Sequence, residues 1–271
     1  MFAGSFYPGK DGELSKFIDG AMGSAEVDPK AVEGAVAYVA PHAGYEYSGK
    51  TAAFTYKAMR YSKNAASADS VVVVGPNHTG KGAPIAVSTS DWETPLGIAQ
   101  NDTELSNAIA STSESLYIDE DAHRGEHSIE VQLPFLQRVL AGKKFCFVCL
   151  GDQSVGSSEL LADAILKASR SLGRKVAVLA SSDFDHYEPA DVAKGKDSKL
   201  LEELKRMDHV AFNGLVDTLD DSICGFGPIT VAMLFAKGMG AHSGMVLNYS
   251  NSGDSTGDYS NVVAYASVVF V

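Results

Sequence analysis

Short apolar runs alternate along the chain with longer segments in which apolar residues recur every three or four positions. Apolar runs rich in β-branched residues are typical of strands that are buried on both faces of a sheet. Such runs predict strands over residues 36–40, 71–74, 85–87, 145–150 and 176–180. The helical spacing predicts helices over residues 50–60, 103–110, 158–172 and 191–207.

This alternation predicts the fold class: a single-domain α/β/α sandwich with a mostly parallel or mixed central sheet. Ser157 or Ser158 is expected to cap the third helix, and Gly173 to follow its end. Pro134 leaves two interpretations for the segment around it. Either a kinked helix spans the segment, or a helix begins near Leu133 with proline in its first turn.

The last third of the chain departs from this alternation. Residues 229–237 predict a buried helix, whereas residues 244–249 and 262–271 predict two strands joined by a Gly/Ser/Asp-rich stretch, 250–260. We expect these two strands to form an antiparallel addition at one side of the sheet. Because no proline- or serine-rich linker divides the chain, residues 1–271 are expected to form one domain.

Charge and composition limit the partners and the compartment. The chain has 22 Lys and Arg against 34 Asp and Glu, a net charge of −12, which repels nucleic acid and anionic membrane surfaces. We therefore expect no nucleic-acid or membrane partner. The sequence has neither a signal peptide nor an apolar run long enough to span a membrane, and its three cysteines do not make a disulfide framework. A cytoplasmic location is expected.

Candidate metal ligands follow the predicted strands. His42 and His78 each come directly after a strand pattern, and the carboxyl ends of strands are where open α/β sheets bind ligands. Imidazole is the commonest metal ligand in proteins. Cys224 adds a thiol that could be a ligand or a nucleophile. Its neighbours Gly225 and Gly227 allow close approach of the backbone, and the dipole of a following helix is expected to lower the pKa of the thiol.

Acid–base chemistry is indicated by the segment Asp183-Phe184-Asp185-His186-Tyr187, which follows the strand predicted over 176–180. In an extended segment Asp183 and His186 would point to opposite faces, so a turn is needed to bring them together. A carboxylate beside an imidazole fixes its tautomer and stabilises its charged form, as a general acid or base requires. We predict Asp183 and His186 as catalytic residues.

Two further motifs are interpreted as parts of the structure and not as metal or redox sites. His123 and His127 have the spacing of a metal-binding helix with a glutamate between them, but Gly125 interrupts the turn. This loop is expected to line the cleft or to order itself through salt bridges. Cys146 and Cys149 form a C-x-x-C pattern within a predicted central strand, where residues three apart face opposite sides. These cysteines are expected to be buried and inert.

Taken in order, several short motifs resemble the Memo family over nearly the whole chain. The motifs are Ala-Gly-Ser-Phe-Tyr-Pro at 3–8, Pro-His-Ala-Gly-Tyr at 41–45, Gly-Pro-Asn-His at 75–78, Trp-Glu-Thr-Pro-Leu-Gly at 92–97, Glu-His-Ser-Ile-Glu at 126–130, Leu-Pro-Phe at 133–135, Ser-Ser-Asp-Phe at 181–184, His-Tyr at 186–187 and Cys-Gly at 224–225. The resemblance implies an α/β/α sandwich similar to class III extradiol dioxygenases, non-haem iron enzymes that open catechol rings. It also implies a metal site at the positions His42, His78 and Cys224, with Asp183 and His186 adjacent.

The resemblance implies a transition metal, with iron first and copper or zinc as alternatives. Class III dioxygenases hold iron(II) through two histidines and a carboxylate, whereas a thiolate in the third position favours softer ions. In archaea and bacteria the family is associated with AMMECR-type and radical SAM proteins, which implies a functional link to them.

These observations lead to one principal expectation and two alternatives. We expect a metal-binding cleft that acts as a dioxygenase-like oxidoreductase on an unknown small molecule. The first alternative is a non-catalytic module that holds a peptide or a small-molecule ligand in the same cleft. The second is a metal-independent cysteine hydrolase, with Cys224 as nucleophile and His186 as base.

Overall fold

The central sheet of the computed structural model, which describes residues 2–271, has the strand order β10-β11-β1-β8-β2-β7-β3-β6. Its strands are β1 (Ala37–Ala40), β2 (Ser70–Pro76), β3 (Ile85–Val87), β6 (Tyr117–Ile118), β7 (Lys144–Leu150), β8 (Val176–Ser181), β10 (Gly244–Asn251) and β11 (Val262–Phe270). The adjacent strands β1, β8, β2 and β7 are parallel, whereas β11 and β3 run antiparallel to their neighbours β1 and β7. The sheet is therefore mixed around a parallel centre.

Two smaller strand pairs lie at the margins. β9 (His186–Glu188) pairs with the start of β11, and β4 (Trp92–Thr94) pairs with β5 (Gly97–Ala99) as a separate hairpin. β10 and β11 are antiparallel and occupy one edge of the sheet, so the addition predicted there is confirmed. The stretch that joins them contains a short helix, α11 (Gly253–Thr256).

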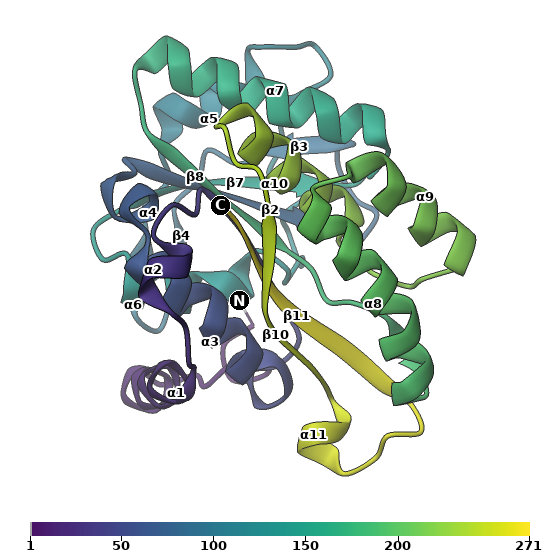
Figure 1. Ribbon diagram of the computed structural model, residues 1–271. Helices are drawn as coiled ribbons and strands as arrows, with labels where there is room; N and C mark the ends of the chain where they lie inside the picture. Colours follow the sequence, from purple (N-terminus) through teal and green to yellow (C-terminus); the bar gives the residue numbers. More distant parts are fainter. Residues whose placement is uncertain (1) are drawn as a thin grey trace.

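Helices cover both faces of the sheet (Figure 1). One face packs against α1 (Asp11–Ser24), α2 (Pro29–Val32), α3 (Tyr45–Tyr61), α4 (Lys63–Ser67) and α6 (Leu133–Val139). The other face packs against α5 (Thr103–Ala110), α7 (Val155–Leu172), α8 (Ala190–Arg206), α9 (His209–Leu219) and α10 (Phe226–Gly238). The predicted α/β/α sandwich is thus confirmed. Within residues 2–271, no helix has the length and apolar composition that a membrane span requires.

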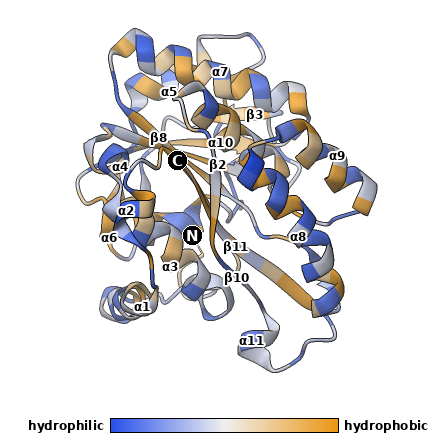
Figure 2. Cartoon of the chain, viewed as in Figure 1, coloured by the Kyte–Doolittle hydropathy of each residue, from blue (hydrophilic) through white to orange (hydrophobic). Residues whose placement is uncertain are grey.

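The central strands are apolar throughout because each contributes side chains to two cores. In β2, Val72 and Val74 belong to the core under α7 and α10, while Val71 and Val73 belong to the core under α3. Figure 2 shows these strands as the hydrophobic interior of the molecule. Cys146 and Cys149 follow the same alternation and are buried in opposite cores, as predicted. Burial raises the pKa of Cys146 to about 12.

The start of α7 differs from the prediction, whereas the start of α6 agrees with one of the two interpretations. α7 begins earlier than expected, because the Ser154 side chain accepts a hydrogen bond from Ser157 N and caps the helix; the prediction of a Ser157 or Ser158 cap was wrong. Gly173 ends this helix in the left-handed conformation, as expected. Around Pro134 the second interpretation is confirmed. A 3₁₀ turn, η1 (Glu130–Gln132), leads into α6, and the proline lies in its first turn, where no intrahelical donor is lost.

Candidate metal centre

Three neighbouring parallel strands each present a polar side chain two residues past their end. His42 follows β1, Asp183 follows β8 and His78 follows β2, and these strands are adjacent in the order β1-β8-β2. Because Ala40 pairs with Ser181, the ends of β1 and β8 are level. The three side chains therefore leave the same edge of the sheet, at the place where α/β sheets bind ligands.

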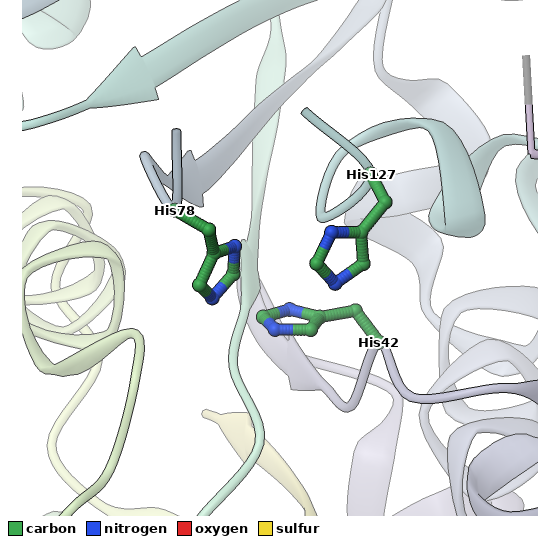
Figure 3. Close-up of side chains that lie close together, drawn as sticks. All are labelled: His42, His78 and His127. Carbon is green, nitrogen blue, oxygen red and sulfur yellow. The ribbon is translucent and has the colours of Figure 1, made fainter. Parts of the chain in front are cut away.

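His127 reaches this edge from the loop that precedes η1. The neighbouring Ser128 Oγ donates a hydrogen bond to the Pro76 carbonyl at 3.0 Å, which ties the loop to the end of β2. Gly75 makes this approach possible, since a Cβ there would lie 2.5 Å from Ser128 Oγ. His42, His78 and His127 consequently converge, with one nitrogen from each lying within 4.8 Å of the others (Figure 3).

The hydrogen bonds around Ser181 fix the tautomer of His42. The Ser181 hydroxyl donates to the Ser128 carbonyl at 2.6 Å and accepts from Gln132 Nε2 at 2.7 Å. Its one proton is thus committed, so His42 Nδ1, at 2.8 Å, must donate to it. The lone pair of His42 is therefore on Nε2, the nitrogen that remains for a metal ion. Burial also lowers the pKa of His42 well below its usual value, which keeps the ring neutral.

Glu126 plays the same part for His78. Its Oε1 lies 2.9 Å from His78 Nδ1 and also accepts from Ser128 N, while its Oε2 accepts from His78 N at 2.6 Å. Burial alone would raise the pKa of Glu126, but these hydrogen bonds outweigh it and lower the pKa to about 2. The carboxylate is ionised, so His78 Nδ1 is the donor and Nε2 carries the lone pair. A histidine held by a carboxylate in this way is typical of metal sites.

The third imidazole lies between Glu126 and the N-terminal segment. His127 Nδ1 is 3.5 Å from Glu126 Oε1, and its ring packs against the ring of Phe6 with centroids 4.5 Å apart. Burial lowers the pKa of His127 to about 4, with His78 acting in the same direction and Glu126 opposing. A neutral imidazole is the form that binds a metal ion.

Cys224 lies beside His42 and is not part of the group formed by the three histidines within residues 2–271. Its Sγ is 3.2 Å from His42 Nε2, and Gly225 allows this approach, since a Cβ there would lie 2.5 Å from the Ser181 carbonyl. The expected lowering of the thiol pKa was wrong. Burial and then the charge of Asp183 raise the pKa of Cys224 well above its usual value. A raised thiol pKa disfavours a metal-independent nucleophile, whereas a bound metal ion would favour the thiolate.

Asp183 and His186 do not form the expected pair in the described chain. Asp183 Oδ1 accepts hydrogen bonds from the main-chain nitrogens of His42 and Ala43, at 2.8 and 3.3 Å, and so holds the loop that carries His42. Burial raises the pKa of Asp183 to about 7 against these hydrogen bonds. His186 is anchored through its main-chain nitrogen to Ser222 Oγ, and within residues 2–271 its buried Nδ1 has no hydrogen-bond partner.

A cavity of about 500 Å³ reaches the histidine group at His127. His127, Asp183 and His186 line it, together with aromatic rings and hydroxyl groups. The rings are those of Phe6, Tyr47, Tyr187 and Tyr265. No lysine or arginine lines it among residues 2–271. Its size is in the range of small-molecule sites.

The donor set fits a transition metal ion. Neutral imidazole and thiol sulfur suit iron, copper and zinc better than calcium or magnesium. The buried, ionised Glu126 forms ion pairs only with imidazoles in the described chain, so a cation among the three histidines would also balance its charge. The three histidines could thus hold a metal ion.

The fold and this side-chain group define a class of protein: an α/β/α sandwich with a histidine group that could hold a metal at the carboxyl edge of its sheet. The chain belongs to the Memo family, since the model of that family, described as Memo-like protein, matches residues 1–269. A MEMO1 family protein of Methanopyrus kandleri is 41% identical over 280 aligned residues, which cover 99% of this chain and 96% of the relative. One from Archaeoglobus fulgidus is 42% identical over 268, covering 99% and 97%.

Among solved structures, the uncharacterized protein JW3007 from Escherichia coli K12 is similar in fold. The TM-score is 0.55 at 12% identity, and the match covers 87% of this chain and 99% of that one. At this identity the likeness supports the shared fold alone.

Proposed function

We propose that this Memo-family chain is a metal-dependent oxidoreductase, dioxygenase-like in its architecture, that acts on a small molecule. The observation that carries the proposal is the convergence of three imidazoles whose nitrogens lie within 4.8 Å of one another. Hydrogen bonds from Nδ1 leave Nε2 available on His42 and His78. An octahedral ion such as iron(II) would keep open positions for substrate beside these ligands, as catalytic metal sites do.

Cys224 is proposed as a further ligand. Its sulfur already lies beside His42 Nε2, and the three imidazoles with one thiolate would favour iron, copper or zinc. In this proposal the ligand set predicted from the sequence is enlarged by His127. The soft sulfur distinguishes it from the two-histidine, one-carboxylate set of the dioxygenases.

The bound metal would supply redox or Lewis-acid activation of the substrate. The chain supplies binding and proton transfer. Aromatic rings such as those of Phe6 and Tyr265 flank a substrate in the cavity. His186, which lines the same cavity, would accept a proton from the substrate, while Asp183 holds the His42 loop by accepting main-chain hydrogen bonds.

Metal analysis of the full chain, purified without a histidine tag, tests the proposal. We expect the protein to bind iron(II), zinc or copper(I) after anaerobic loading, and substitution of His42 or His127 by alanine to weaken binding by at least about tenfold. The exposed Glu114→Gln variant is the matched control and should bind like the parent chain. A parent chain that binds none of these ions tightly would refute the proposal.

A second candidate function is a binding module that holds a peptide or small molecule without turnover. The aromatic walls of the cavity favour it, because rings such as Tyr187, which is 75% exposed at the margin, can contact an apolar ligand without any chemistry. The variant His186→Ala separates the two functions. Loss of a measured reaction with unchanged ligand affinity supports catalysis, whereas a ligand that binds but is never converted supports the module.

A further inference from the structure

A second cavity, of about 400 Å³, shares no lining residue with the first, and the proposed oxidoreductase binds no substrate in it. Glu126 and Phe2 belong to its lining, while His127 and Phe6 belong to that of the first cavity. We propose that this second cavity is a binding site for a small organic cation carrying a primary ammonium group. The proposal does not require a bound metal ion, although Glu126 borders both sites.

The charge of the lining favours a cation. Among residues 2–271, five carboxylates and one arginine line the cavity. The carboxylates are Asp91, Glu93, Glu120, Glu126 and Glu130. The arginine, Arg124, is largely exposed and pairs with Asp121 outside the cavity. An anionic ligand would be repelled here, whereas an ammonium group would reduce the mutual repulsion of the carboxylates.

A buried imidazole independently indicates that a ligand binds here. His123 lines the cavity at 7% exposure, and neither of its ring nitrogens has a hydrogen-bond partner in the described chain. Burial lowers the pKa of His123, and the charge of Glu120 and then the Ala86 carbonyl oppose this shift. Neither group forms a well-aligned hydrogen bond with the ring. The ring is therefore neutral and has one nitrogen that can only accept. Unpaired buried polar atoms cost free energy, and a ligand with N–H donors would satisfy this one.

Trp92 indicates that the cation bound in this cavity is organic. Its indole ring packs edge-on to His123 with centroids 5.5 Å apart and forms part of the cavity wall. An aromatic face attracts an ammonium group with an alkyl chain. A divalent metal ion is disfavoured, because within residues 2–271 the carboxylates of this lining do not form a group that could hold one. A quaternary ammonium is disfavoured too, since it has no N–H to donate to His123.

The chain carries its own reporter for this site, because Trp92 is its one tryptophan. The full chain would be titrated with n-butylamine at constant pH and ionic strength while indole emission is recorded. Matched titrations would use n-butanol, which is neutral, and butyrate, which is anionic. We expect a saturable change with n-butylammonium, binding at least about tenfold weaker for n-butanol and no binding of butyrate.

Two variants test whether the change in indole emission comes from binding in this cavity. His123→Phe removes the acceptor and should weaken n-butylammonium binding by about tenfold or more. Glu93→Gln removes one charge from an exposed side chain that has no partner within residues 2–271, so it tests the charge without risk to folding; we expect about threefold weaker binding. Glu114→Gln, away from the cavity lining, should have no effect. Equal responses to n-butanol and n-butylammonium, or unchanged affinity in both variants, would overturn the proposal.

Discussion

Replacing Glu126 by glutamine should weaken metal binding without changing any of the proposed ligands. The carboxylate accepts three hydrogen bonds, two from His78 and one from Ser128, and glutamine has only one oxygen to accept them. In one orientation its amide nitrogen faces His78 N, and in the other it faces His78 Nδ1 and Ser128 N. A donor therefore meets a donor in either case.

The second orientation also acts on the metal site. An amide N–H that donates to His78 Nδ1 moves the proton of that ring to Nε2 and removes the lone pair that a metal needs. The negative charge of Glu126, whose pKa of about 2 keeps it ionised, is lost as well. Changes of this kind typically reduce metal affinity about 10- to 100-fold, which corresponds to about 1.4–2.7 kcal/mol. The unpaired donor should also lower the free energy of unfolding by about 1–3 kcal/mol.

The assay is competition for zinc or cobalt(II) against a chromophoric chelator, with urea unfolding measured separately on the metal-free chain. Glu114→Gln is the control for loss of an exposed charge. The variant Glu126→Asp keeps the negative charge on a shorter side chain, so it separates the effect of the charge from the effect of the hydrogen bonds. If folded Glu126→Gln binds metal within about twofold of the parent chain, the inference that Glu126 sets the tautomer of His78 is wrong.

Three further predictions address the other groups. Cys224→Ser should remove the sulfur-to-metal charge-transfer band of the cobalt(II) protein while the histidines still bind the ion; an unchanged spectrum would exclude Cys224 as a ligand. His186→Ala should leave zinc affinity within about twofold but abolish any metal-dependent reaction, and a large loss of affinity would instead make His186 a ligand. Burial raises the pKa of Asp197 to about 8, above its unfolded value, so its contribution to stability is present in acid and lost as pH rises towards 8. Urea unfolding at pH 5, 7 and 9 should show this decline, and Asp197→Asn should flatten it.

The sequence predicted the central strands and the positions of His42 and His78 because both follow from local pattern. A strand buried on both faces is apolar along its length, and the first polar residues after it mark the carboxyl edge of the sheet. The helix α1 also had a local signal, since the buried residues Leu14 and Ile18 lie one turn apart, yet its many polar residues obscured it.

His127 could not be assigned as a ligand in this way. It follows no strand, and its position depends on contacts distant in sequence, such as that of Ser128 with Pro76, 52 residues away. Gly75 permits this contact because it has no Cβ, but the residues next to it in the sequence give no sign of that role. Asp183 was predicted from its place after a strand, but its hydrogen bond from His42 N was not, because that contact spans 141 residues.

The Ser181 hydroxyl joins three parts of the chain at one oxygen atom: the end of β8, the His42 loop and the segment from Ser128 to Gln132. Exchange of this serine for alanine would leave the sheet intact while freeing the His42 ring to turn or to carry its proton on either nitrogen. Loss of this one oxygen atom would therefore separate the protonation of a candidate metal ligand from the rest of the fold.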